Sequence, residues 1–117
     1  LSSLCPCLLR NIEHAQAVLQ HLHQGSMPVT VFEKAPVLAA LSVPDIYEKL
    51  VPSELAATYQ AYEIVDRLVG IKITWRPIGG EHGDVDALIT NHANDALARS
   101  RRLLDRINFV VEAMKAQ

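Results

Sequence analysis

The sequence predicts an all-α fold, an up-and-down bundle of four to five helices that forms one domain over residues 1–117. Three observations support this prediction. Half of the residues are apolar but only 5% are aromatic, which is typical of an aliphatic core. Apolar residues recur every three or four positions over long stretches, which is the period of one helix face. Prolines and glycines gather mainly between these stretches, where they end helices.

The composition narrows the classes of function. The chain has 11 basic and 13 acidic residues and a net charge of −2, with a pI near 6.2. Nucleic-acid-binding domains are usually basic, so we expect no nucleic-acid partner. The two cysteines, Cys5 and Cys7, are too few for a disulfide scaffold. They are also poor partners for each other, because only one residue separates them.

The first helix is predicted over residues 4–24. Ser2 or Ser3 caps its start, and Pro6 suits a first turn in which no amide donor is needed. Gly25 ends the helix. Its apolar face consists of Leu8, Leu9, Ile12, Ala15, Val18, Leu19 and Leu22.

Prolines divide the next segment into two short predicted helices, over residues 31–41 and 44–50. Thr30 followed by Glu33 resembles a capping box at the start of the first of them. Pro36 is expected to kink this helix, because proline removes a backbone donor and clashes with the preceding turn. The side chains expected to point inward are Phe32, Leu38, Leu41, Ile46 and Leu50.

A longer helix is predicted over residues 53–76, with Ser53 as its cap. It has two apolar stripes, one made of Leu55, Tyr59, Tyr62, Val65 and Val69, the other of Ala57, Ala61, Ile64, Leu68, Ile71 and Trp75. Only a narrow face is left for water, so the helix either sits centrally or forms an interface. One alternative stays open. Residues 71–76 also alternate as a strand does, and in that case they pair with residues 29–31.

The last helix is predicted over residues 84–115. It would be about 48 Å long, whereas a compact domain of this size has a radius of gyration of about 13–14 Å. The helix therefore either breaks near residues 91–94 or projects and meets a partner. Its apolar seam has heptad spacing, which is typical of paired helices. We expect a homodimer through the seam residues Ile89, Ala93, Ala96, Ser100, Leu103, Ile107, Val110 and Met114.

Two groups of side chains are candidates for binding other molecules. Aromatic residues on the 53–76 helix are either core residues or the lining of a small-molecule pocket; these are Tyr59, Tyr62 and Trp75. Arginines on one face of the last helix are candidates for an acidic protein partner; these are Arg99, Arg102 and Arg106. Acidic residues among the arginines also fit a plain solvated face.

No motif indicates catalysis, a cofactor or a metal ion. The five histidines lack the i, i+3 or i+4 spacing of helical metal ligands, so we expect no metal and no cofactor. An enzyme that uses His92 with the acidic stretch 81–86 is the least favoured alternative.

The chain has no stretch of about 20 apolar residues, so we expect no transmembrane span. We expect a cytoplasmic location, with an upstream membrane anchor as the alternative. A proline-broken segment followed by Val-Pro-Ser-Glu-Leu and a Tyr-rich helix resembles the helical domains that follow a membrane anchor in some bacterial proteins. That resemblance implies no particular activity. The sequence thus predicts a helical interaction or assembly module that self-associates through its last helix, with a small-molecule-binding bundle as the alternative.

Overall fold

The computed structural model of the protein describes residues 4–26, 30–42, 52–75 and 83–116. Within these ranges the chain forms four helices and no strand, which confirms the all-α prediction. The predicted helix over residues 44–50 lies outside the described residues. The helices are α1 (Leu4–His23), α2 (Ala35–Leu41), α4 (Pro52–Trp75) and α5 (Gly83–Lys115).

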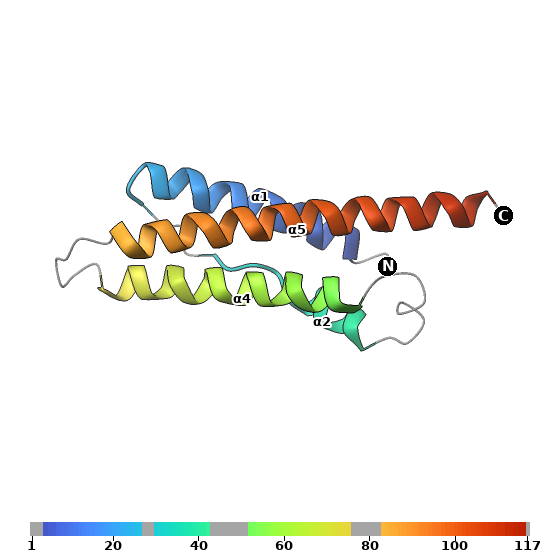
Figure 1. Ribbon diagram of the computed structural model, residues 1–117, viewed down its shortest axis with the longest axis horizontal. Coiled ribbons are helices and arrows are strands. Elements are labelled where there is room, and N and C mark those ends of the chain that lie inside the picture. The colour runs from blue at the N-terminus through green and yellow to red at the C-terminus, as the bar shows by residue number, and fades with distance from the viewer. Residues whose placement is uncertain (1–3, 27–29, 43–51, 76–82, 117) are drawn as a thin grey trace.

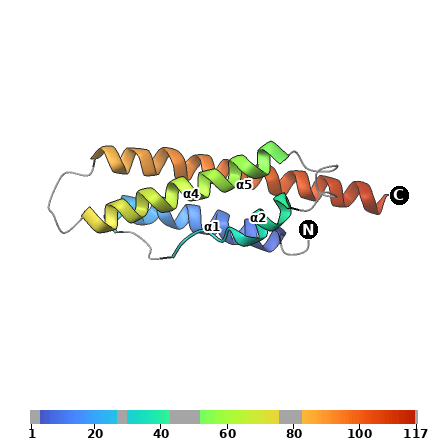
Figure 2. The same ribbon diagram turned by 90° about the horizontal axis from the view of Figure 1, so that it is seen from below.

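Three long helices lie side by side, and α5 contacts both α1 and α4 (Figure 1). The chain runs along α1, returns through residues 30–41, runs along α4 and returns along α5, so successive segments are antiparallel. The short helix α2 lies against the first half of α4 (Figure 2). The molecule is elongated, with principal extents of 59 × 23 × 19 Å and a radius of gyration of 15.8 Å.

The predicted limits of the three long helices agree with the observed ones to within one residue. Helix α5 is unbroken, so the break considered near residues 91–94 does not occur. Its C-terminal end extends past the first turns of α1 and α4 (Figure 1). Helix α5 therefore projects from the bundle, and the partner expected with this projection stays a prediction.

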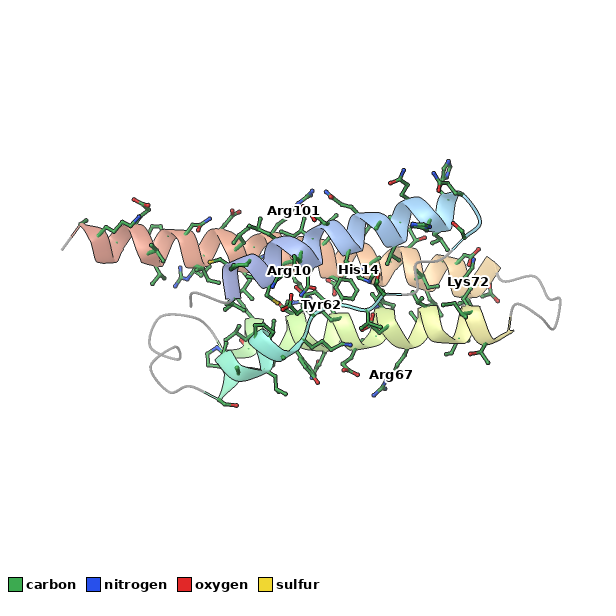
Figure 3. All side chains as sticks on the ribbon, turned by 180° about the vertical axis from the view of Figure 1, so that it is seen from behind. Arg10, His14, Tyr62, Arg67, Lys72 and Arg101 are labelled. Atoms are coloured by element: carbon green, nitrogen blue, oxygen red, sulfur yellow. The ribbon has the colours of Figure 1, made fainter. Side chains whose placement is uncertain are left out.

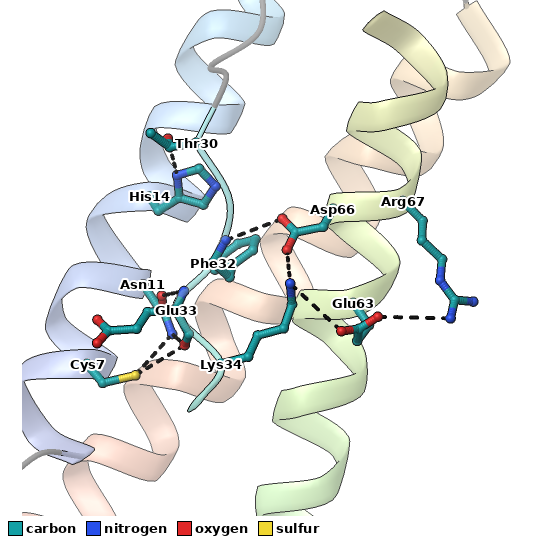
Figure 4. A network of polar contacts seen from close by, with 10 residues as sticks. All are labelled: Cys7, Asn11, His14, Thr30, Phe32, Glu33, Lys34, Glu63, Asp66 and Arg67. Atoms are coloured by element: carbon teal, nitrogen blue, oxygen red, sulfur yellow. Dashed lines mark hydrogen bonds and ion pairs between the residues drawn. The ribbon is translucent and has the colours of Figure 1, made fainter. Parts of the chain in front are cut away.

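The prediction for residues 31–41 was wrong in its first part. Residues 30–34 are not helical, and the helix begins only at Ala35. Pro36 lies in the first turn of α2 and starts the helix, where a missing amide donor costs nothing, so it does not kink it. We call residues 30–34 the strap, because this segment crosses between α1 and α4 (Figure 4).

The end of α4 is helical, not a strand. Residues 71–75 continue the helix, and the Thr74 hydroxyl donates a hydrogen bond of 2.8 Å to the Gly70 carbonyl one turn earlier. The Lys72 ammonium is almost buried and pairs with Asp86, which joins the end of α4 to the start of α5. No strand pairing with residues 30 and 31 exists, and residues 29 and 76 lie outside the described ranges.

The core is mainly aliphatic and lies between the three long helices and the strap. Phe32 points inward as predicted and is 2% exposed. Leu9 and Leu38, which the sequence placed inside, are about half exposed, because each lies on the edge of its helix. The largest side chains with no more than 1% exposure are Tyr62, Leu8, Leu55, Ile89, Leu103 and Ile107.

Candidate interaction surface

Most of the predicted seam of α5 is buried inside this chain. Helix α5 packs against α1 on one side and α4 on the other, so its seam faces its own bundle. Val110 is half-buried, and the side chain of Met114 lies outside the described residues. The part of the seam available to a partner therefore begins after Ile107. The buried seam residues are Ile89, Ala93, Ala96, Ser100, Leu103 and Ile107.

The small residues of the seam accommodate an aromatic side chain from α4. The Tyr62 ring is fully buried, and its hydroxyl is hydrogen-bonded to the Ser100 hydroxyl. Ser100 itself donates a hydrogen bond of 2.7 Å to the Ala96 carbonyl, so Tyr62 is the donor in the first bond. Burial raises the pKa of Tyr62. The tyrosine is thus a neutral, fully bonded core residue.

Tyr59 and Tyr62 do not share a pocket. Tyr59 lines an open hollow of about 410 Å³ on the outer side of α4, together with Gln60, Glu63, Ile64 and Arg67. The ring of Tyr62 instead stacks on Phe32, with centroids 4.5 Å apart and an interplanar angle of 14°. The side chain of Trp75 lies outside the described residues.

Polar side chains of α1 hold the strap. The Asn11 amide donates a 2.8 Å hydrogen bond to the Glu33 carbonyl and accepts one of 2.8 Å from the Glu33 amide (Figure 4). The Cys7 thiol donates to the same carbonyl over 3.2 Å. Burial, the largest cause, and the neighbouring Glu33 carboxylate raise the pKa of Cys7 to about 11. The thiol is therefore protonated at neutral pH and is no nucleophile.

Charged side chains hold the strap on the α4 side. Lys34 pairs with Asp66 and lies 3.8 Å from Glu63. The Phe32 amide donates to the Asp66 carboxylate over 3.4 Å. Figure 4 shows these contacts as one network that reaches from α1 across the strap to α4. Its donors and acceptors satisfy each other, so we interpret the network as structural.

His14 of α1 contacts the strap edge-on, with its ring centroid 4.5 Å from that of Phe32 (Figure 4). Burial lowers the pKa of His14 below the usual 6.5; Asp66 opposes this shift and Lys34 adds to it. The unfolded chain therefore binds the proton more readily than the folded one, and stability rises with pH. We expect the free energy of unfolding to be level above about pH 7.5 and to fall as the pH drops through about 6.5.

A denaturant series at several pH values checks this prediction. The His14→Gln variant carries no titrating group at this position and is expected to lose the decrease near pH 6.5. The hydrogen bond from Arg10 lowers the pKa of the Glu33 carboxyl. The loss of stability that follows from protonation of Glu33 therefore occurs at a more acidic pH, and it is expected in both proteins. An unchanged decrease near pH 6.5 in His14→Gln would contradict the role of His14.

The arginines of α5 lie among acidic side chains, and Arg99 and Arg102 line one hollow together with Glu54. Arg99 pairs with Asp95 over 2.9 Å within its own helix. Arg102 and Arg106 line an open hollow of about 460 Å³ between α5 and the start of α4, but Glu54 and Asp105 line the same hollow. Mixed charge of this kind is typical of a solvated surface.

Phe109 is the residue of this hollow that the sequence analysis missed. It is 67% exposed, the highest value among the exposed large hydrophobic residues of the described ranges. The Arg106 guanidinium lies 6.0 Å from its ring centroid. The run Ile-Asn-Phe-Val-Val near the helix end was the available signal, because it places apolar residues on more than one helix face.

No three His, Cys, Asp or Glu side chains of the described residues are grouped as metal ligands. None of the described helices contains an apolar stretch that is long enough to cross a membrane.

Comparison of the chain with family models, curated proteins and solved structures gives no match. The fold thus defines the class of the protein, an all-α helical bundle with a projecting last helix.

Proposed function

We propose that the protein is an assembly module that self-associates through the C-terminal part of α5. The single observation that carries this proposal is Phe109, which is 67% exposed near the C-terminal end of α5. Figure 1 shows this end of α5 extending past the other helices. Burying a phenylalanine side chain is worth about 1.5–3 kcal/mol. A helix end without neighbours also gains little stability from its own hydrogen bonds. A second helix that packs along this end buries the Phe109 side chain and stabilises the last turns of α5.

The charges around Phe109 favour a second copy of the same helix as the partner. When two such helices pair antiparallel with Phe109 on the two-fold axis, residues equally far from it on either side face each other. Arg106 then lies opposite Glu112 of the second copy, and the pair occurs twice. Ala113 and Ala116 provide small side chains beside the two phenylalanine rings. The charges on this surface are therefore self-complementary.

Sedimentation velocity over a range of protein concentrations tests the proposal. We expect Phe109→Glu to weaken self-association at least about tenfold, because it places two carboxylates against each other on the axis. Leu88→Glu is the matched control, since Leu88 is a 45% exposed residue at the other end of the same helix. Arg106→Glu should weaken association, and Arg106→Glu combined with Glu112→Arg should restore it. Equal association of wild type and Phe109→Glu would overturn the proposal.

A further inference from the structure

We propose that the outer face of α4 is a second, separate self-association surface, on which a second copy of the chain packs antiparallel. The outer face consists of Tyr59, Gln60, Glu63, Arg67, Gly70 and Ile71. It is distinct from the α5 surface, and the observations that support it do not depend on Phe109.

Apolar side chains on this side of α4 have no cover. Ile64 is 38% exposed and Ile71 is 43% exposed, and both belong to the second apolar stripe of the helix. Tyr59 is half-buried and lines the open hollow with Ile64. One chain does not use this stripe fully, because α5, α2 and the strap pack against the other faces of α4.

Gly70 is the second observation. It lies in the interior of α4 and is exposed, and a Cβ atom built on it has nothing within 4 Å. Its backbone is helical, so no left-handed conformation requires glycine here. Glycine weakens a helix relative to alanine. A glycine that this chain's own packing does not need is explained by a neighbouring helix that approaches closely.

The charges identify that neighbour as the same face of a second copy. In an antiparallel pair around an axis at position 65, residues equally far from this position on either side face each other. Glu63 then lies opposite Arg67 of the second copy, twice. Within one chain these two side chains form an exposed ion pair, 3.9 Å apart at closest, and Arg67 points away from the bundle (Figure 3). In the pair of chains, Arg67 exchanges this partner for Glu63 of the second copy.

The same geometry places matching side chains at the remaining positions. Gln60 lies opposite Gly70 of the second copy, where the glycine leaves room for it. Tyr59 lies opposite Ile71 of the second copy, so the exposed Ile71 side chain of each chain is covered. With two self-complementary surfaces, one on α4 and one on α5, the protein assembles beyond a dimer.

The experiment uses the Phe109→Glu variant, in which the α5 surface is disabled. Sedimentation velocity of this variant should still show a dimer at high protein concentration. Adding Gly70→Leu should weaken this dimer at least about tenfold, while its melting temperature at low concentration rises, because leucine has the higher helix propensity. Misfolding cannot produce this combination. Ala87→Leu, which adds the same side chain to an exposed alanine of α5, is the matched control.

A charge exchange gives a second readout in the Phe109→Glu background. Glu63→Arg or Arg67→Glu alone should weaken the dimer, and the two together should restore it. A Phe109→Glu protein that is monomeric at every concentration would overturn the α4 surface and leave the α5 surface intact. A dimer that Gly70→Leu does not weaken would also overturn it. If only the proposal for the α5 surface is wrong, wild type and Phe109→Glu associate equally.

Discussion

Replacing Tyr62 by alanine is expected to lower the free energy of unfolding by about 3–5 kcal/mol, the usual cost of removing a large aromatic side chain from a core. The ring is fully buried and stacks on Phe32. Its hydroxyl also bonds Ser100 of α5, so one side chain joins α4 to both the strap and α5. Guanidinium or urea unfolding followed by circular dichroism measures the change.

Two variants separate the contributions of Tyr62. Tyr62→Phe keeps the ring and should cost about 1 kcal/mol, because Ser100 still donates to the Ala96 carbonyl after the tyrosine hydroxyl is removed. Tyr59→Ala is the matched control on the same helix, and its half-buried side chain predicts a much smaller loss. If Tyr59→Ala and Tyr62→Ala destabilise the protein equally, Tyr62 does not have the central position described above.

The long helices could be predicted almost to the residue because local signals define them. Apolar residues follow the helical period without interruption, and Gly25 and Pro52 lie beside helix ends. These signals act within a few residues of each other, so the sequence shows them directly. The length of α5 required either a break or a projection, since a helix of 33 residues is longer than a compact domain of this size, and its unbroken seam favoured the projection.

The strap could not be predicted, because its backbone is bonded by a residue far away in the sequence. Thr30 and Glu33 resemble a capping box, but the Glu33 amide and carbonyl both bond Asn11, 22 residues earlier. Such a pairing leaves no periodic signal. Local propensity favoured a helix here, and the long-range bonds to Asn11 and Asp66 prevailed.

The seam shows what a heptad pattern leaves undecided. The spacing from Ile89 to Ile107 indicates that α5 is packed along its length, but it is the same for packing within one chain and between two chains. In the structure α1 and α4 occupy this seam. Exposed apolar surface lies elsewhere, at Phe109 and on the outer face of α4.

Replacing Asn11 by leucine is expected to cost about 2–4 kcal/mol of stability and to loosen the strap. Asn11 is 1% exposed, and its amide group takes the place of a backbone partner for the Glu33 amide and carbonyl. Leucine has a similar size but leaves both backbone groups without this partner, and each unpaired buried group costs about 1–3 kcal/mol. The Cys7 thiol still reaches the carbonyl, so the amide is the group most affected.

Two measurements on Asn11→Leu distinguish a loose strap from a general loss of stability. Hydrogen exchange of the Glu33 amide should become much faster than in the wild type. Exchange of amides in the middle of α5 should change only as much as the free energy of global unfolding changes. The matched control Asn94→Leu, at an exposed position of α5, should change neither exchange nor stability by more than about 0.5 kcal/mol. If the Glu33 amide stays protected in Asn11→Leu, α1 does not hold the strap through this side chain, and Lys34 and Asp66 on the α4 side suffice to keep it in place.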